Sequence, residues 1–402
     1  MNTSKLIGLI PEEGEIRNIK QKYARISAYA HTARCLALTK DKNAEEFIGN
    51  ALIEVNGLHE KEIGRRALAY ARCAESYSIM GSKHSTPTVN AAIKEIMKAK
   101  PTSSILDHDK IIISISRSGV NLNDIKIIGT ARQLCDRIYG RTDFVPAFCS
   151  VAECYAHLGE TEKALETVHA AQDEVLRRRF DKEKIGCFLT DIAVAIVKIG
   201  EIANDAKIIA KYLETVKVLR EITLGRTDGK VYENVYGADL RYLYAKQSDI
   251  RVTVAAANAL INIGWNDNAW ALMEMNRNFW DNDLILNLNN LIELDVFGIY
   301  TFETFLNIAY TFYGIDEKEK SKRILRHIEN YLFDRSYFEQ SVSIRRVLER
   351  NISVLIKMAL LWGEMNDENA NEIINEIYDR IKDTDVDERA FILSEILSSI
   401  QS

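Results

Sequence analysis

Residues 145–175 of this sequence have the pattern of two short helices joined by a tight turn. The stretch reads VPAFCSVAECYAHLGETEKALETVHAAQDEV, and the turn falls at Gly159. Glycine adopts the left-handed backbone conformation that ends many helices at no steric cost. Apolar residues recur at three- and four-residue spacing on both sides of it, as in helices with one buried face. The stretch therefore predicts a helical hairpin.

Weaker copies of this pattern recur before and after it at roughly 40-residue spacing, the period of stacked helical repeats. Residues 28–33 read AYAHTA and residues 69–74 read AYARCA. Small residues at this spacing let one helix approach another closely, so tandem helices are expected to cross there. Each such repeat buries its apolar face against the next, and the core grows lengthwise. The 402-residue chain is therefore predicted to be an all-α solenoid.

The positions of the other hairpins are predicted from glycines that could form their turns. The isoleucine-rich run HDKIIISISRSG could also form a strand, but Gly119 matches Gly81 and Gly159 in position and favours a helix. Residues 183–216 form the next hairpin, with its turn expected at Gly200. Two later hairpins are expected at residues 302–332, around Gly314, and 344–381, around Gly363, followed by a capping helix at 388–400.

The frame after Gly225 has two interpretations. Residues 235–245 pair with 250–263, or 250–263 is itself a first helix that ends at Gly264 and pairs with 268–279. The loop-like segment TLGRTDGK at residues 223–230 lies just before this ambiguity. We therefore predict two arrays, residues 1–222 and residues 223–402, which are continuous with each other.

Six residues of the clearest hairpin alternate small and large side chains at fixed spacing: Ala152, Tyr155, Gly159, Ala164, Val168 and Ala171. This pattern resembles the tetratricopeptide repeat, with Phe148 at the early aromatic position and no closing proline. The resemblance implies a right-handed α-α superhelix of about eight hairpins with a C-terminal capping helix. It also implies that the first helices line a concave groove that binds extended peptides or helices.

The groove positions of the first helices that are expected to contact a partner are Arg34, Glu75, Ser78, Glu153, His157, Lys198, Asn258 and Asn262. A second feature is a cluster of aromatic residues that includes Trp265, Trp270 and Trp280. One interpretation places these tryptophans in the core. The other leaves some exposed as an interaction patch for a partner or for self-association, because aromatic residues are enriched at such anchors.

Three segments resemble known phosphate-binding or metal-binding motifs, but none has the required residues at the required spacing. The segment 225–230 resembles a phosphate-binding loop, but it is one residue short and has Val231 where Ser or Thr should bind magnesium. The helix that begins at His59 has Ile63 where a zinc protease has its second histidine. Asp383, Asp385 and Asp387 begin like a calcium loop, but the required glycine is missing. We expect no catalytic, cofactor-binding or metal-binding residues, and no enzyme activity.

The net charge and the cysteines limit the kinds of partner and the cellular compartment that we expect. The net charge of −6 argues against nucleic acid, which is bound by clustered Lys and Arg. The six cysteines include no CxxC pair, so they are expected to be buried in a reducing compartment. No run is long and apolar enough for a membrane span, and the N-terminus lacks a signal peptide, so we expect a cytoplasmic protein.

The sequence thus predicts a non-catalytic scaffold or adaptor that binds a protein or peptide partner. The alternatives are an RNA-binding helical-repeat protein and an all-helical enzyme whose site assembles from distant repeats.

Overall fold

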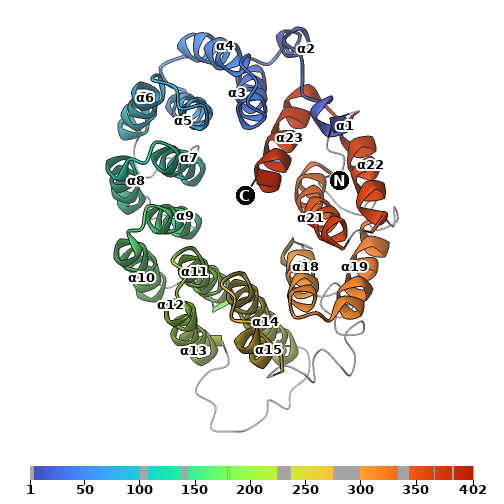
Figure 1. The fold of residues 1–402 in the computed structure, drawn as a ribbon. Coiled ribbons are helices and arrows are strands. Elements are labelled where there is room, and N and C mark those ends of the chain that lie inside the picture. Colours follow the sequence, from blue (N-terminus) through green and yellow to red (C-terminus); the bar gives the residue numbers. More distant parts are fainter. Residues whose placement is uncertain are drawn as a thin grey trace. The chain divides into compact units, whose positions relative to one another are not determined.

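The computed structural model describes ten segments of the chain, and every regular element in them is an α-helix (Figure 1). The described residues are 4–99, 107–137, 144–178, 180, 182–223, 237–274, 299–333, 344–365, 367–382 and 384–401. They confirm the predicted all-α solenoid, because within each compact unit helices pair as hairpins and neighbouring hairpins pack on one another. The run HDKIIISISRSG is helical, as predicted.

The chain divides into two compact units. Unit 1 comprises residues 1–147 and 343–402, and unit 2 comprises residues 148–342. The boundary falls within α9 (Phe144–His157). The predicted division at residues 222 and 223 adjoins residues 224–236, which lie outside the described residues, and it stays a prediction.

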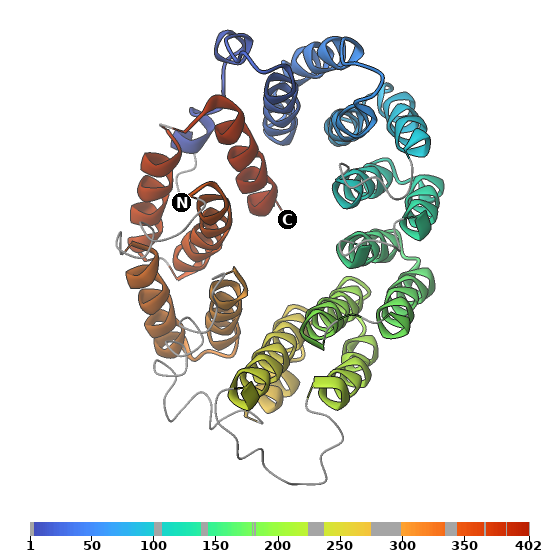
Figure 2. The same cartoon turned by 180° about the vertical axis from the view of Figure 1, so that it is seen from behind.

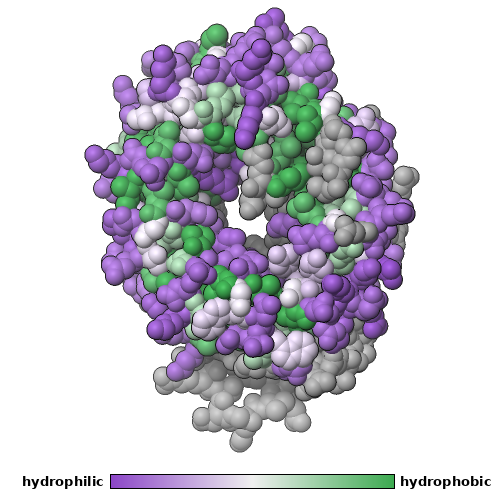
Figure 3. Space-filling model, viewed as in Figure 1, coloured by the Kyte–Doolittle hydropathy of each residue, from purple (hydrophilic) through white to green (hydrophobic). Residues whose placement is uncertain are grey.

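Unit 1 is built from hairpins whose first helices lie side by side. Its helices are α1 (Ser4–Ile7), α2 (Glu13–Arg17), α3 (Lys22–Leu38), α4 (Ala44–Asn56), α5 (Ile63–Ile79), α6 (Ser85–Lys98), α7 (His108–Asn121), α8 (Ile125–Arg137), α21 (Ile344–Glu364), α22 (Asn369–Ile381) and α23 (Val386–Gln401). The first helices α3, α5 and α7 pack in a row, and α4, α6 and α8 each cover their own first helix. On the face in Figure 3, hydrophobic residues show near α6–α8 among mainly hydrophilic ones.

Unit 2 is also built from helical hairpins, and its first helix α14 is the longest of the described helices, with 26 residues. Its helices are the rest of α9, then α10 (Thr161–Arg177), α11 (Lys182–Ile202), α12 (Ala206–Ala210), α13 (Tyr212–Thr223), α14 (Gly237–Asn262), α15 (Asn266–Glu274), α18 (Ile299–Gly314) and α19 (Lys318–Phe333). The first helices α11, α14 and α18 pack in order, and α15 and α19 cover α14 and α18. One interpretation of the ambiguous frame is therefore correct: residues 250–262 belong to a first helix that pairs with the helix after Gly264.

The alanines shared by residues 28–33 and 69–74 form the core between the first helices. Ala28, Ala30, Ala33, Ala69, Ala71 and Ala74 are all buried. Their small side chains let α3 and α5 approach closely, as the sequence predicts.

The hairpins share one turn geometry. In seven turns that the structure describes, one residue after the first helix has a positive φ, and these residues are Lys40, Gly81, Asn123, Gly159, Asn204, Gly264 and Asp316. The N–H of the following residue donates to the carbonyl five residues earlier at 2.7–3.0 Å. This is the Schellman bond, which satisfies an otherwise unpaired carbonyl at the helix end.

Four glycines assigned to turns lie in helices instead. Gly119, Gly200 and Gly363 are inside α7, α11 and α21, and Gly314 is the last residue of α18, with the positive φ of its turn at Asp316. A Cβ on Gly119 would lie 2.7 Å from Ile128, and one on Gly200 would lie 2.6 Å from the backbone of Ile209. These two glycines therefore allow close helix packing, and the turns after α7 and α11 use asparagine instead.

The last helix, α23, packs on two partners within unit 1. It covers α21, as expected of a capping helix, and it also packs along α3 (Figure 2). Its contacts with α3 include several hydrogen bonds: His31 Nδ1 lies 3.0 Å from Ser394 Oγ, and Arg34 bonds to Glu395 at 2.7 Å and Ser398 at 3.0 Å. The capping helix therefore joins the last hairpin of the chain to the first one.

Candidate functional site

A row of polar side chains crosses four consecutive first helices of unit 2 near their C-terminal ends. His157 is at the end of α9, and Lys198 and Glu201 are in the last turns of α11. Asn262 ends α14, and Tyr310 lies in the second half of α18. His157, Lys198 and Asn262 are exposed, while Glu201 and Tyr310 are half-buried. We call these five residues the polar row.

Four members of the polar row, from Lys198 to Tyr310, contact one another in sequence. Lys198 Nζ lies 3.6 Å from Glu201 Oε2. Asn262 Nδ2 donates to Glu201 Oε1 at 2.7 Å, and the Tyr310 hydroxyl donates to Asn262 Oδ1 at 3.4 Å. Burial lowers the pKa of His157, and the charge of Lys198 lowers it further, so this imidazole is neutral at neutral pH. The row thus offers one cation, one carboxylate and several neutral hydrogen-bonding groups.

Two of the predicted groove residues, Lys198 and Asn262, are therefore brought together by Glu201, and His157 lies close enough to Lys198 for that charge to lower its pKa. Glu153 is half-buried one turn before His157 on α9. Asn258 has a different position: it donates to the Asn307 carbonyl at 3.2 Å and accepts from Thr311 Oγ1 at 2.5 Å. Its amide therefore holds α14 against α18.

The sequence reasoning missed two members of the row. Glu201 follows Lys198 by three residues and so shares its helix face, which is a signal the sequence offers. Tyr310 is in a hairpin for which no groove position was assigned. Its place in the row follows from the packing of α18 on α14.

The predicted groove residues of unit 1 are buried. Arg34 Nη2 lies 3.2 Å from Glu75 Oε1, and their side chains are 10% and 6% exposed. Arg117 approaches the same carboxylate at 3.8 Å. Ser78 donates to the Glu75 carbonyl at 2.7 Å and accepts from Asn121 at 3.0 Å. The polar atoms of Arg34, Glu75 and Ser78 thus bond within the chain and join α3, α5 and α7.

The tryptophans have different environments. Trp265 and Trp270 are 49% and 40% exposed, whereas Ala269 and Met273 provide the buried face of α15. Trp280 lies outside the described residues. The interpretation that places the whole cluster in the core is therefore wrong for Trp265 and Trp270.

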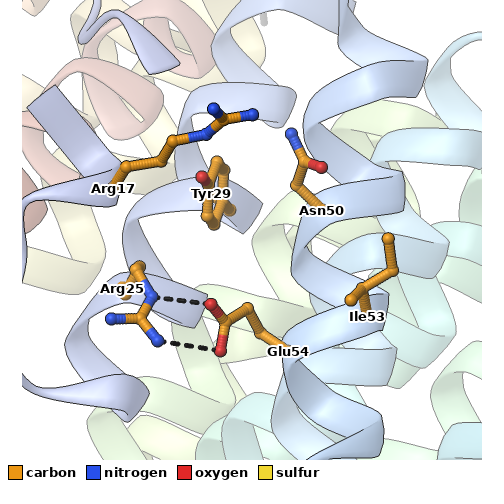
Figure 4. A pocket seen from close by; sticks show the side chains of 6 residues that line it. All are labelled: Arg17, Arg25, Tyr29, Asn50, Ile53 and Glu54. Atoms are coloured by element: carbon orange, nitrogen blue, oxygen red, sulfur yellow. Dashed lines mark hydrogen bonds and ion pairs between the residues drawn. The ribbon is translucent and has the colours of Figure 1, made fainter. Parts of the chain in front are cut away.

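A small polar pocket of about 240 Å³ lies in unit 1 where α2, α3 and α4 meet (Figure 4). Its charged side chains are already paired. Arg25 makes two hydrogen bonds to the Glu54 carboxylate, at 2.7 and 3.0 Å, and Arg17 pairs with Glu13. Tyr29 stands between the two arginines in Figure 4. Because each arginine is neutralised by a carboxylate, the pocket offers a poor site for an anion.

The described residues offer little for metal or thiol chemistry. Among them, no group of three or more His, Cys, Asp and Glu residues could hold a metal ion. Five cysteines are buried and Cys187 is exposed. Burial raises the pKa of the Cys35 and Cys73 thiols to about 12, so these thiols stay protonated and unreactive at neutral pH. In the part of the chain that the structure describes, no helix has the length and apolarity to span a membrane.

Comparison with known proteins gives this chain no relatives in sequence. No protein family and no curated protein matches it. A structure search aligns it with the crystal structure of Ton1535 from Thermococcus onnurineus NA1, covering 100% of this chain and 99% of that one at 15% identity. The TM-score is 0.28, too low to carry any inference. The likeness to tetratricopeptide repeats therefore remains a resemblance in sequence pattern.

Proposed function

We propose that this chain is a non-catalytic helical-repeat protein that binds a protein or peptide partner along the polar row of unit 2. The observation that supports this proposal most is the continuous contact from Lys198 through Glu201 and Asn262 to Tyr310 across three first helices. Asparagine and tyrosine can each donate and accept hydrogen bonds, and a peptide backbone needs both. A partner that lies across the helices would meet such a group on each one.

The charges of the row favour a polypeptide over nucleic acid. Affinity for a phosphate backbone grows with the number of clustered Lys and Arg residues. The row has one lysine, and Glu201 lies next to it. Charges of both signs at one site match a polypeptide that carries both signs.

A site-specific crosslink tests the proposal. The photo-crosslinking residue p-benzoylphenylalanine replaces exposed His157, and a control carries it at exposed Glu162 on α10. In an extract of the source cells, we expect a protein to crosslink at position 157 and not at position 162. Mass spectrometry identifies it, and the purified pair gives an affinity.

The double variant Lys198→Glu and Asn262→Ala then tests whether the row makes the contact. We expect its affinity for the purified partner to fall about tenfold or more, since interface hydrogen bonds to charged groups contribute roughly 1.5–3 kcal/mol. An unchanged affinity, or no crosslinked protein at position 157, refutes the proposal. Crosslinks to RNA with steep salt dependence would favour the nucleic-acid alternative.

A further inference from the structure

Trp265 is an apolar residue at a turn position that is polar in the other described hairpin turns. The residue after the positive-φ position is Asp41, Ser82, Asp124, Glu160, Asp205 or Glu317 in the other turns, and Trp265 after Gly264. The backbone is the same in all of them: Trp265 N–H donates to the Leu260 carbonyl at 2.7 Å. The turn therefore does not require tryptophan.

The polar residues at this position stabilise the start of the second helix. The carboxylates of Asp41, Asp124 and Asp205 each accept a hydrogen bond from the backbone N–H two residues later, at 2.8–2.9 Å. Tryptophan has no acceptor for this bond, because its indole only donates. A side chain that forgoes a local stabilising bond, and remains 49% exposed, is the kind of departure expected at a functional position.

Trp265 lies at a pocket of about 380 Å³ between α12–α13 and α14–α15. The lining is mostly apolar, and Leu213 on the opposite wall is 54% exposed. Ala206 and Ala210, one turn apart on α12, and Ala271 on α15 also line it. Small side chains on both walls leave room for large side chains from outside. We call this pocket the Trp265 pocket.

We propose that the Trp265 pocket binds the apolar face of an acidic amphipathic helix from a partner protein. Lys207 is the charged residue among those that line the pocket, so a carboxylate on the partner would complement it. The half-exposed Trp265 and Leu213 side chains mark a wide opening, whereas a small ligand is normally buried by 70–90% or more of its surface. Large apolar side chains at helical spacing can fill such a groove from one side.

A peptide selection on the full-length protein tests this site. The probe is a library of random linear peptides, selected on the wild-type protein and counter-selected on Trp265→Asp. This variant restores the residue type of the other turns, so its unfolding midpoint should equal or exceed that of the wild type. We expect enriched peptides to carry large apolar residues at helical spacing, flanked by Asp or Glu.

Fluorescence anisotropy of the labelled peptides then measures affinity. We expect Trp265→Asp to weaken binding about thirtyfold, as for an interface hot spot. Lys207→Glu should weaken it too, and should favour a peptide whose carboxylates are replaced by lysine. Lys198→Glu, in the polar row, should leave the affinity unchanged, which separates this site from the proposed function.

Three results would overturn the proposal. The selection could enrich no peptide above the counter-selection, or the enriched peptides could bind Trp265→Asp as tightly as the wild type. Analytical ultracentrifugation could also show that Trp265→Asp dissociates a dimer, in which case the occupant is a second copy of this chain.

Discussion

Removal of the Arg34 charge should destabilise unit 1 far more than removal of Glu395, although Arg34 pairs with Glu395 at a shorter distance than with Glu75. Arg34 lies on α3 and bonds to Glu75 on α5 at 3.2 Å and Glu395 on α23 at 2.7 Å. Arg34→Met keeps an unbranched apolar stem and deletes the charge. It leaves the Glu75 carboxylate buried, with Arg117 at 3.8 Å as its remaining cation.

The magnitudes follow from burial. Deleting one partner of a buried ion pair costs roughly 3–5 kcal/mol, because the other charge stays out of water without compensation. Arg117 compensates in part, so we expect about 3 kcal/mol for Arg34→Met. Glu395 is 50% exposed, and exposed pairs contribute about 0.2–1 kcal/mol, so Glu395→Gln should cost less than about 1 kcal/mol. The double variant Arg34→Met and Glu75→Gln should recover part of the loss, since no buried charge is left unpaired.

Trp362 provides the assay. It is the tryptophan of unit 1, since the other three (Trp265, Trp270 and Trp280) lie in unit 2. It is fully buried in α21, so its fluorescence reports the unfolding of this unit. With the other three replaced by phenylalanine, urea titration gives the free energy of unfolding of unit 1 for each variant.

A cost below about 1 kcal/mol for Arg34→Met would refute the reasoning, because a buried unpaired charge is expected to cost several times that. Equal costs for Arg34→Met and Glu395→Gln would refute it too. That result would mean that the contact with α23, and not burial against α5, determines the energy.

Two further predictions use the same assay. Burial and, to a smaller extent, neighbouring cations lower the pKa of His31 well below its usual value. Below about pH 6.5 this histidine is therefore protonated in the unfolded chain but stays neutral in the folded one. Stability should therefore fall between about pH 7 and 5, by at most about 1.4 kcal/mol per pH unit, and less so in His31→Gln. His59→Gln, which removes an exposed histidine, serves as the control variant. Gly49 lies inside α4, and a Cβ added there would have no neighbouring heavy atom within 4 Å. Gly49→Ala should therefore raise the free energy of unfolding by about 0.5–1 kcal/mol, because alanine favours the helix more than glycine does. Gly119→Ala should destabilise by about 1–3 kcal/mol, because its Cβ meets Ile128; equal midpoints for the two alanine variants would contradict this.

The sequence located the hairpins because helix formation and turn geometry are largely local. The alternating pattern of residues 145–175 and the alanines of residues 28–33 and 69–74 correctly predicted paired helices with close crossings. Several turn positions were predicted wrongly. Glycine serves two purposes in this chain, and Gly119 allows close helix packing while Asn123 adopts the positive φ of the turn. A single sequence does not distinguish these two uses.

The candidate site was predicted only in part. His157, Lys198 and Asn262 were identified from their places on first helices, and they do lie along one row. The same reasoning selected Arg34 and Glu75, which the structure buries. The difference arises in α23, since Glu395 and Ser398 reach Arg34 from more than 360 residues along the chain.

The sequence by itself thus determined the class of fold, the hairpins and the residues available to the first helices, because these depend on contacts within about one repeat. The tertiary structure decided which of those residues remain accessible. The docking of α23 on α3 buries Arg34, while the gap between α12–α13 and α14–α15 leaves Trp265 half-exposed. Burial depends on which distant helix packs on a side chain, and no local pattern encodes that pairing.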